Sequence, residues 1–151
     1  MDQFATSIEL RLPSRLGFEK IAMNTAASVA RIMGFSLDRI EDLKTAIAEA
    51  CINAMEHGNH LDESLCVGVT LSMTNDTLEV RVLDTGKGPK FPVEVPDIDK
   101  KMHEEQQPRG MGIFLIKALV DEAEWVTSPT SGSYARLVIR LPQTEIDQPA
   151  N

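Results

Sequence analysis

Glu49 and Asn53 are the two side chains of this sequence best placed to do chemistry. They lie four residues apart at the start of the string Glu49–Gly58, which reads EACINAMEHG. On an α-helix, residues four apart project from the same face, so a carboxylate and an amide oxygen would stand together. A carboxylate can accept a proton from a hydroxyl group, and an amide oxygen can ligate Mg²⁺. An ordinary solvated helix face is the alternative interpretation.

The opposite face of this predicted helix is apolar. At about 100° per residue, the apolar positions fall within a stripe roughly 80° wide, whereas Glu49 and Asn53 lie on the other side, about 40° apart. We therefore expect the helix to bury one side and to present an acid and an amide on the other. The residues of the stripe are Ile40, Leu43, Ile47, Cys51 and Ala54.

Two glycine clusters follow this helix. Asp84–Gly88 comes directly after an alternating strand, and Arg109–Gly112 opens an apolar helical run. An aspartate at a strand end can accept a hydrogen bond from the amino group of a flat heterocycle, and glycines beside it let the backbone approach closely. A glycine-rich helix start offers free N–H groups and a positive dipole end to phosphate oxygens. Taken singly, each cluster is also compatible with a plain turn.

In this order, the three motifs resemble the nucleotide site of the GHKL ATPase superfamily. The pattern Glu49…Asn53…His57-Gly58 and the string RGMGIFL, Arg109–Leu115, are similar to those of the bacterial anti-sigma-factor serine/threonine kinases of partner-switching systems. The resemblance covers nearly the whole chain. It implies ATP and Mg²⁺ as cofactors.

The resemblance also suggests a role for each candidate residue. Glu49 is expected to be the catalytic base, Asn53 the Mg²⁺ ligand and Asp84 the adenine anchor. Arg109 either adds charge at the phosphates or points to solvent. Ser133 stands where the family often has a threonine that supports the adenine contact. The full set of expected nucleotide-binding positions is Asn53, Asp84, Gly86, Gly88, Arg109, Gly110, Met111, Gly112 and Ser133.

The elements that position these residues follow from periodicity and from turn signals. Alternating residues predict strands near 8–12, 65–73, 78–83, 125–126 and 134–141. Helical spacing predicts one helix capped by Ser14 and ending near Gly34, a second capped by Ser36, and a third over about 110–120.

Hairpin-linked strands with three helices predict an α/β (α+β) two-layer sandwich, with a mixed, mostly antiparallel sheet covered on one face by helices. The resemblance implies the Bergerat-type ATP-binding fold, which has this order of elements. The polar segment Pro89–Pro108 occupies the position of that fold's lid, although a plain surface loop would look the same.

Composition is typical of one small globular domain. The chain has 151 residues, and we expect a single ATP-binding kinase domain over 1–142 and a disordered tail over 143–151. A net charge of −8 argues against a nucleic-acid surface. The sequence shows no signal peptide and no apolar run long enough to span a membrane, so we expect a cytoplasmic protein.

Two classes of function are compatible with these residues. The first is a serine/threonine protein kinase that phosphorylates a small antagonist protein of the STAS type and sequesters a sigma factor or another target. The second is a nucleotide-gated binding module, an anti-sigma factor without kinase activity. Glu49 favours the kinase, because a pure binding module needs no carboxylate one turn from the metal ligand.

Two further expectations concern the architecture of the protein. A sensor histidine kinase is disfavoured, because no helical hairpin with a phospho-acceptor histidine precedes the first strand. The resembling kinases are homodimers, and we expect a dimer through the Ile8–Leu12 edge strand.

Overall fold

A computed structural model describes residues 6–84, 108–128 and 132–142 of the chain. Within these ranges no helix is both long enough and apolar enough to cross a membrane. The predicted lid as far as residue 107, the predicted tail 143–151 and two of the predicted site residues, Gly86 and Gly88, lie outside the described residues, whereas Pro108 begins a helix. In chain order the elements are β1 (Thr6–Pro13), α1 (Glu19–Met33), α2 (Leu37–Asn53), the π-helical turn η1 (Ala54–Gly58), β2 (Cys66–Met73), β3 (Thr77–Asp84), α4 (Pro108–Leu119), β4 (Glu122–Ser128) and β5 (Gly132–Arg140).

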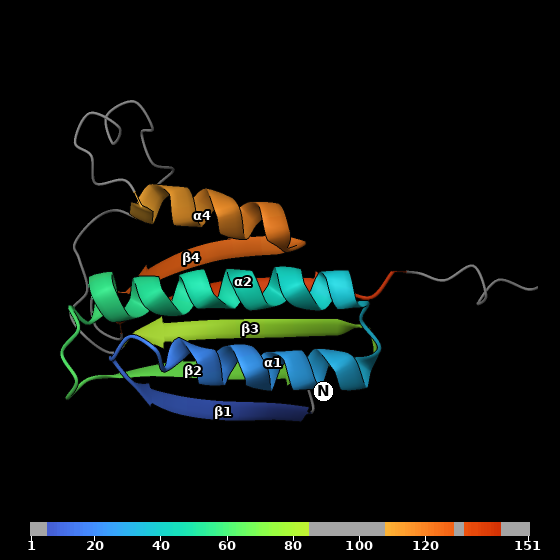
Figure 1. The fold of residues 1–151 in the computed structure, drawn as a ribbon, viewed down its shortest axis with the longest axis horizontal. Coiled ribbons are helices and arrows are strands. Elements are labelled where there is room, and N and C mark those ends of the chain that lie inside the picture. The colour runs from blue at the N-terminus through green and yellow to red at the C-terminus, as the bar shows by residue number, and fades with distance from the viewer. Residues whose placement is uncertain (1–5, 85–107, 129–131, 143–151) are drawn as a thin grey trace, which may run out of the picture.

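The strands form a single sheet in the order β1-β2-β3-β5-β4. All four pairings between the described strands are antiparallel. The helices α1, α2 and α4 cover one face of this sheet (Figure 1). The predicted two-layer sandwich, with helices on one face only, is therefore confirmed.

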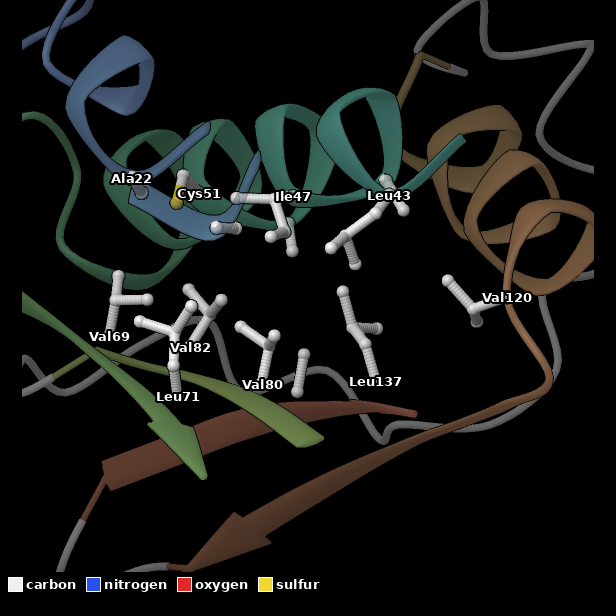
Figure 2. Close-up of a cluster of buried hydrophobic side chains, with 14 of the residues drawn as sticks. Ala22, Leu43, Ile47, Cys51, Val69, Leu71, Val80, Val82, Val120 and Leu137 are labelled. Atoms are coloured by element: carbon white, nitrogen blue, oxygen red, sulfur yellow. The ribbon is translucent and has the colours of Figure 1, made fainter. Parts of the chain in front are cut away.

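The core lies between the helix layer and the sheet. Figure 2 shows Leu43, Ile47 and Cys51 of α2 pointing toward Val80 and Val82 of β3. Every residue of the predicted apolar stripe of α2 is buried, as the helical spacing required. Burial raises the pKa of the Cys51 thiol to about 12, so this cysteine is an uncharged core residue.

The start of α1 differs from the prediction. Ser14 does not cap this helix: α1 begins five residues later, at Glu19, and Phe18 occupies the N-cap position without a side-chain hydrogen bond. Ser14 is buried instead, and its Oγ donates a hydrogen bond to the Leu65 carbonyl oxygen at 2.7 Å. A buried hydroxyl must find a partner, and here the partner precedes β2, the strand that pairs with β1, rather than lying in the adjacent helix.

The predicted ends at Gly34 and Ser36 are confirmed, and the third helix, predicted over about 110–120, spans Pro108–Leu119. Ser36 caps α2 by accepting a hydrogen bond from the Arg39 backbone N–H at 3.2 Å. Gly34 ends α1 with a φ of 103°, the left-handed conformation that favours glycine at this position.

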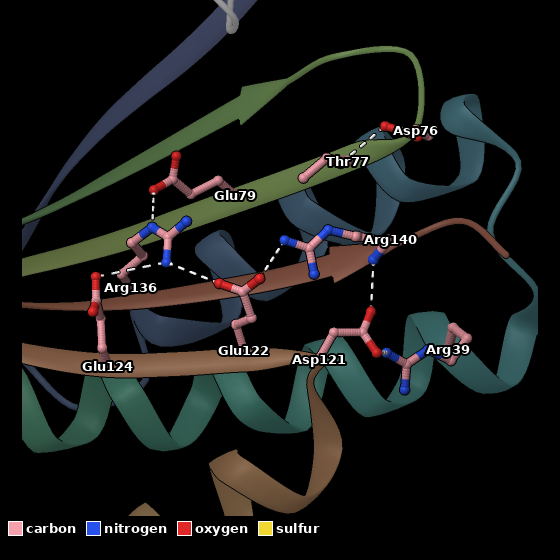
Figure 3. Close-up of polar contacts among 9 residues, drawn as sticks. All are labelled: Arg39, Asp76, Thr77, Glu79, Asp121, Glu122, Glu124, Arg136 and Arg140. Atoms are coloured by element: carbon pink, nitrogen blue, oxygen red, sulfur yellow. Dashed lines mark hydrogen bonds and ion pairs between the residues drawn. The ribbon is translucent and has the colours of Figure 1, made fainter. Parts of the chain in front are cut away.

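The face of the sheet away from the helices carries a network of ion pairs (Figure 3). Its centre is Glu79 of β3, whose carboxylate accepts from Arg81 Nε at 3.1 Å and from Arg136 Nε at 2.5 Å. Arg136 Nη1 also reaches Glu122 at 3.2 Å and Glu124 at 3.6 Å on β4. These charges are satisfied by one another across β3, β5 and β4, so this face needs no covering layer.

Candidate functional site

Three elements that are far apart in the sequence meet at one end of the molecule. The C-terminal end of α2, the end of β3 and the start of α4 all lie at the left of the view in Figure 1. Glu49 and Asn53 occupy the last turn of α2, and Asp84 is the last residue of β3. Gly112 is the fifth residue of α4.

Gly112 brings α4 into direct contact with the acid–amide pair. A methyl group in place of its hydrogen would lie 2.7 Å from Glu49 Oε1 and 3.6 Å from Asn53 Nδ2. Glycine at this position lets α4 approach the half-buried Glu49 and Asn53 side chains without displacing the Glu49 carboxylate. The fold thus places a carboxylate, an amide and a glycine-rich helix start next to one another.

Asp84 is a buried acid with an unused acceptor. The residue is 7% exposed, and its Oδ1 atom is buried and has no hydrogen-bond partner among the described residues. Burial raises the pKa of its carboxyl group to about 6, against the opposing effects of a hydrogen bond with the Ser133 backbone and of the His60 charge. A buried acceptor without a hydrogen bond costs folding free energy, because it has lost its contact with water. A bound ligand with a hydrogen-bond donor would remove this cost.

The chain turns at the end of α2 through η1, which packs on Asp84. The Asn59 backbone N–H donates to the Ala54 carbonyl oxygen at 2.8 Å, five residues back, which is the spacing of a π-helix. A methyl group at Gly58 would lie 2.5 Å from both Cγ and Oδ2 of Asp84. The backbone of η1 therefore forms one wall against the carboxylate.

The structure brings five of the ten predicted site residues into two groups. Glu49, Asn53 and Gly112 are in contact, and Asp84 pairs with Ser133 across β3 and β5. The backbone of Arg109–Met111 forms the first turn of α4, but the side chains of these residues are outside the described part of the structure.

Two residues that act on Asp84, and a third between them, were not predicted from the sequence as site residues. Gly58 packs on its carboxylate, Asn59 follows directly, and the charge of His60 acts on the Asp84 pKa. Gly58 could have been predicted as a site residue, because it belongs to the same sequence motif as Asn53. Asn59 and His60 had no such signal, since the course of the chain at both residues depends on the π-turn.

Comparison with known proteins agrees with this geometry. Residues 12–139 match the family described as the histidine kinase-like ATPase domain. The serine-protein kinase RsbW of Halalkalibacterium halodurans is 30% identical over 145 residues, which span 93% of this chain and 87% of that protein. The serine-protein kinase RsbW of Bacillus subtilis is 32% identical over 126 residues, which span 81% of this chain and 79% of that protein.

A solved structure has the same fold. The crystal structure of the RsbU and RsbW domains of a Mycobacterium tuberculosis protein matches with a TM-score of 0.66 at 20% identity. The match covers 93% of this chain and 34% of that longer chain. With the sequence relatives at 30% identity and above, these matches show that the chain belongs to the histidine kinase-like ATPase family, among relatives named serine-protein kinases.

Proposed function

We propose that this protein is a cytoplasmic, ATP-dependent serine/threonine protein kinase that phosphorylates a small antagonist protein and, when not so engaged, sequesters a sigma factor or another target. The observation that carries the proposal is the contact of Gly112 with Glu49 and Asn53. It joins a potential base, a potential metal ligand and a phosphate-binding helix start in one place. The serine-protein kinase names of the relatives support the same activity.

The nucleotide is proposed to lie between η1, the end of β3 and the start of α4. Asp84 Oδ1 would accept a hydrogen bond from the adenine amino group, and Ser133 would support Asp84 from β5. Gly86 and Gly88 would leave space for the base. Near the phosphates, the backbone N–H groups of Gly110, Met111 and Gly112 would act as donors, and Arg109 would add positive charge.

Asn53 is the protein residue proposed to hold Mg²⁺. The described residues contain no group of three or more His, Cys, Asp or Glu side chains that could hold a metal ion. A single amide ligand fits Mg²⁺, which commonly takes its other ligands from nucleotide phosphates and water. When bound, Mg²⁺ would neutralise charge on the phosphates.

Glu49 is proposed to act as the general base. The acceptor hydroxyl oxygen forms a bond to the γ-phosphorus of ATP, and the bond from that phosphorus to the β–γ bridging oxygen breaks. The hydroxyl proton passes to the Glu49 carboxylate, and ADP leaves. Glu49 is half-buried on the polar face of α2, so its carboxylate can face both the site and an incoming protein chain.

The direct test of kinase activity is transfer of radiolabel from γ-labelled ATP to a small STAS-type antagonist encoded beside this protein. We expect a labelled serine or threonine, identified by mass spectrometry, and no transfer by Asn53→Ala because Mg²⁺-dependent nucleotide binding is lost. Tight ATP binding by the wild type without transfer to any antagonist would reject the kinase and leave a nucleotide-gated binding module.

A homodimer through β1 is part of the proposal. Among the described strands β1 pairs only with β2, so its other edge has unpaired backbone groups. Exposed apolar side chains lie nearby in the fold: Ile8 on β1, and Ile21 and Ile32 eleven residues apart on one face of α1. Ile32 is 85% exposed, and apolar side chains that gather on one surface are typical of a protein interface. Sedimentation at micromolar concentration should show a dimer, and only a 16.7 kDa species would contradict it.

A further inference from the structure

The loop after η1 is held from two sides by one buried amide. Asn59 is 1% exposed, and its Nδ2 donates to Ser14 Oγ at 2.8 Å and to the Cys66 carbonyl oxygen at 3.1 Å. Ser14 Oγ in turn donates to the Leu65 carbonyl oxygen. Since Ser14 follows β1 and Cys66 begins β2, this one side chain joins the end of η1 to the start of the strand layer.

The backbone at Asn59 needs such a restraint. Next to it, His60 and Leu61 have φ values of 55° and 58°, a left-handed conformation that residues with a Cβ rarely adopt. The Leu61 backbone N–H donates to the Met55 carbonyl oxygen at 2.7 Å, which continues the wide turn of η1. A strained turn of this kind persists only where its surroundings fix it, and the Asn59 hydrogen bonds provide part of that fixing.

Gly58 links this loop to Asp84 by direct packing. It directly precedes Asn59, and a methyl group on it would lie 2.5 Å from the Asp84 carboxyl carbon and 2.7 Å from Asp84 Cβ. Because the contact includes Cβ and Cγ as well as Oδ2, a rotation of the carboxylate alone cannot create space. Movement of the loop would therefore change where Asp84 presents Oδ1, the oxygen that has no partner among the described residues.

We infer that Asn59 is a positioning residue for recognition of the adenine base. Through Gly58 it holds Asp84 so that Oδ1 faces the ligand, and Ser14 is the second member of the same restraint. The inference rests on the proposed function, in which Asp84 accepts a hydrogen bond from the adenine amino group. It assigns Ser14 and Asn59 a part in choosing the nucleotide although neither is proposed to touch it.

The test compares two nucleotides by calorimetry: ATP and purine riboside triphosphate, which lacks the amino group. The wild type should prefer ATP. Asn59→Ala should reduce that preference about tenfold, because Asp84 is no longer aligned with the amino group. The control is Ile139→Val, a buried change opposite Leu78 at the far end of β3, which should leave the preference unchanged. Circular dichroism identifies the variants that are folded.

The outcomes separate this inference from the function on which it rests. An unchanged preference in folded Asn59→Ala, or an equal loss of affinity for both nucleotides, would show that Asn59 only stabilises the fold. If Asn59→Ala does not fold, Ser14→Ala serves instead, because it keeps the hydrogen bond to Cys66, and we expect a smaller fall in the preference. A wild type that binds neither nucleotide would reject the proposed function itself.

Discussion

Glu79 and Asp84 are buried carboxylates on the same strand, yet their surroundings differ in kind. Glu79 is 4% exposed and faces the open side of the sheet, where two arginines hydrogen-bond to it. Asp84 is 7% exposed and faces the helices, where one of its oxygens has no partner among the described residues. A buried acid whose partners are all supplied by the fold is structural. A buried acid with an acceptor left over is suited to bind a ligand.

The largest effect should come from exchanging these acids for amides. Asp84→Asn should weaken ATP binding about 10²-fold, because an amino donor can replace the acceptor oxygen. Its thermal midpoint at pH 7 should rise, since a buried charge is removed. Glu79→Gln should behave in the opposite way, with ATP affinity retained and a free energy of unfolding lower by roughly 1–3 kcal/mol. Calorimetry and thermal melts measure both quantities, and equal ATP affinities in the two variants would remove the distinction.

Alanine substitutions at Gly58 and Gly112, the two glycines that contact the site, should affect stability and phosphoryl transfer differently. Gly58→Ala should destabilise the fold by roughly 1–3 kcal/mol and weaken ATP binding, because the methyl group meets both Cβ and the carboxylate of Asp84. Gly112→Ala should instead preserve the fold and reduce phosphoryl transfer, since its methyl group meets the movable end of Glu49.

Gly68→Ala is the matched control for both glycine variants. A methyl group there would lie 3.9 Å from Leu83 Cβ, an ordinary van der Waals contact. We expect ATP affinity and transfer close to those of the wild type. A loss in Gly68→Ala as large as in Gly58→Ala would show that the measured effects are not specific to the site.

Several features of this site could not be predicted from the sequence. The stripe of α2 and the alternating strands were predictable, because burial follows their period. Ser14 was misassigned because a local capping signal gave way to a hydrogen bond with Leu65, which is 51 residues away in the sequence. The π-turn after Asn53 has no periodic signature, so the contact of Gly58 with Asp84 appears only in three dimensions.

Helix α1 shows a related limit of sequence reasoning. Ile21 and Ile32 of this helix are exposed, although isoleucine is among the most hydrophobic residues. The buried face consists mainly of alanines, with Val29. Alanine side chains allow α1 to pack closely on its neighbours. A pattern based on hydrophobicity misses this face, because it ranks alanine below isoleucine.

A smaller effect should appear in the pH dependence of ATP binding. The Asp84 pKa is raised from 3.8 to about 6 by burial, so its contribution to stability is present below pH 3.8 and is lost as the pH rises through 6. ATP affinity should change in the opposite sense and fall as the pH is lowered through 6, because the carboxylate is the better acceptor. Calorimetry between pH 5 and 7.5 in excess Mg²⁺ tests this, with Asp84→Asn as the variant that should lack this component of the pH dependence.

The smallest effect is expected at the rim of the open face. Glu122 pairs with Arg136 and Arg140, and these hydrogen bonds lower the pKa of its carboxyl group. Its side chain is 43% exposed, so water can replace these partners. Glu122→Gln should leave both the thermal midpoint and ATP affinity near the wild-type values. A midpoint shift as large as that of Glu79→Gln would show that the network acts as a single unit.

Glu49→Gln tests the central claim, that this is a kinase with Glu49 as its base. The substitution keeps the shape and hydrogen-bonding capacity of the side chain next to Gly112 and removes only its ability to take a proton. We predict unchanged ATP affinity and a loss of about two to four decades in the rate of phosphoryl transfer to the antagonist. Transfer by Glu49→Gln at the wild-type rate would contradict the account.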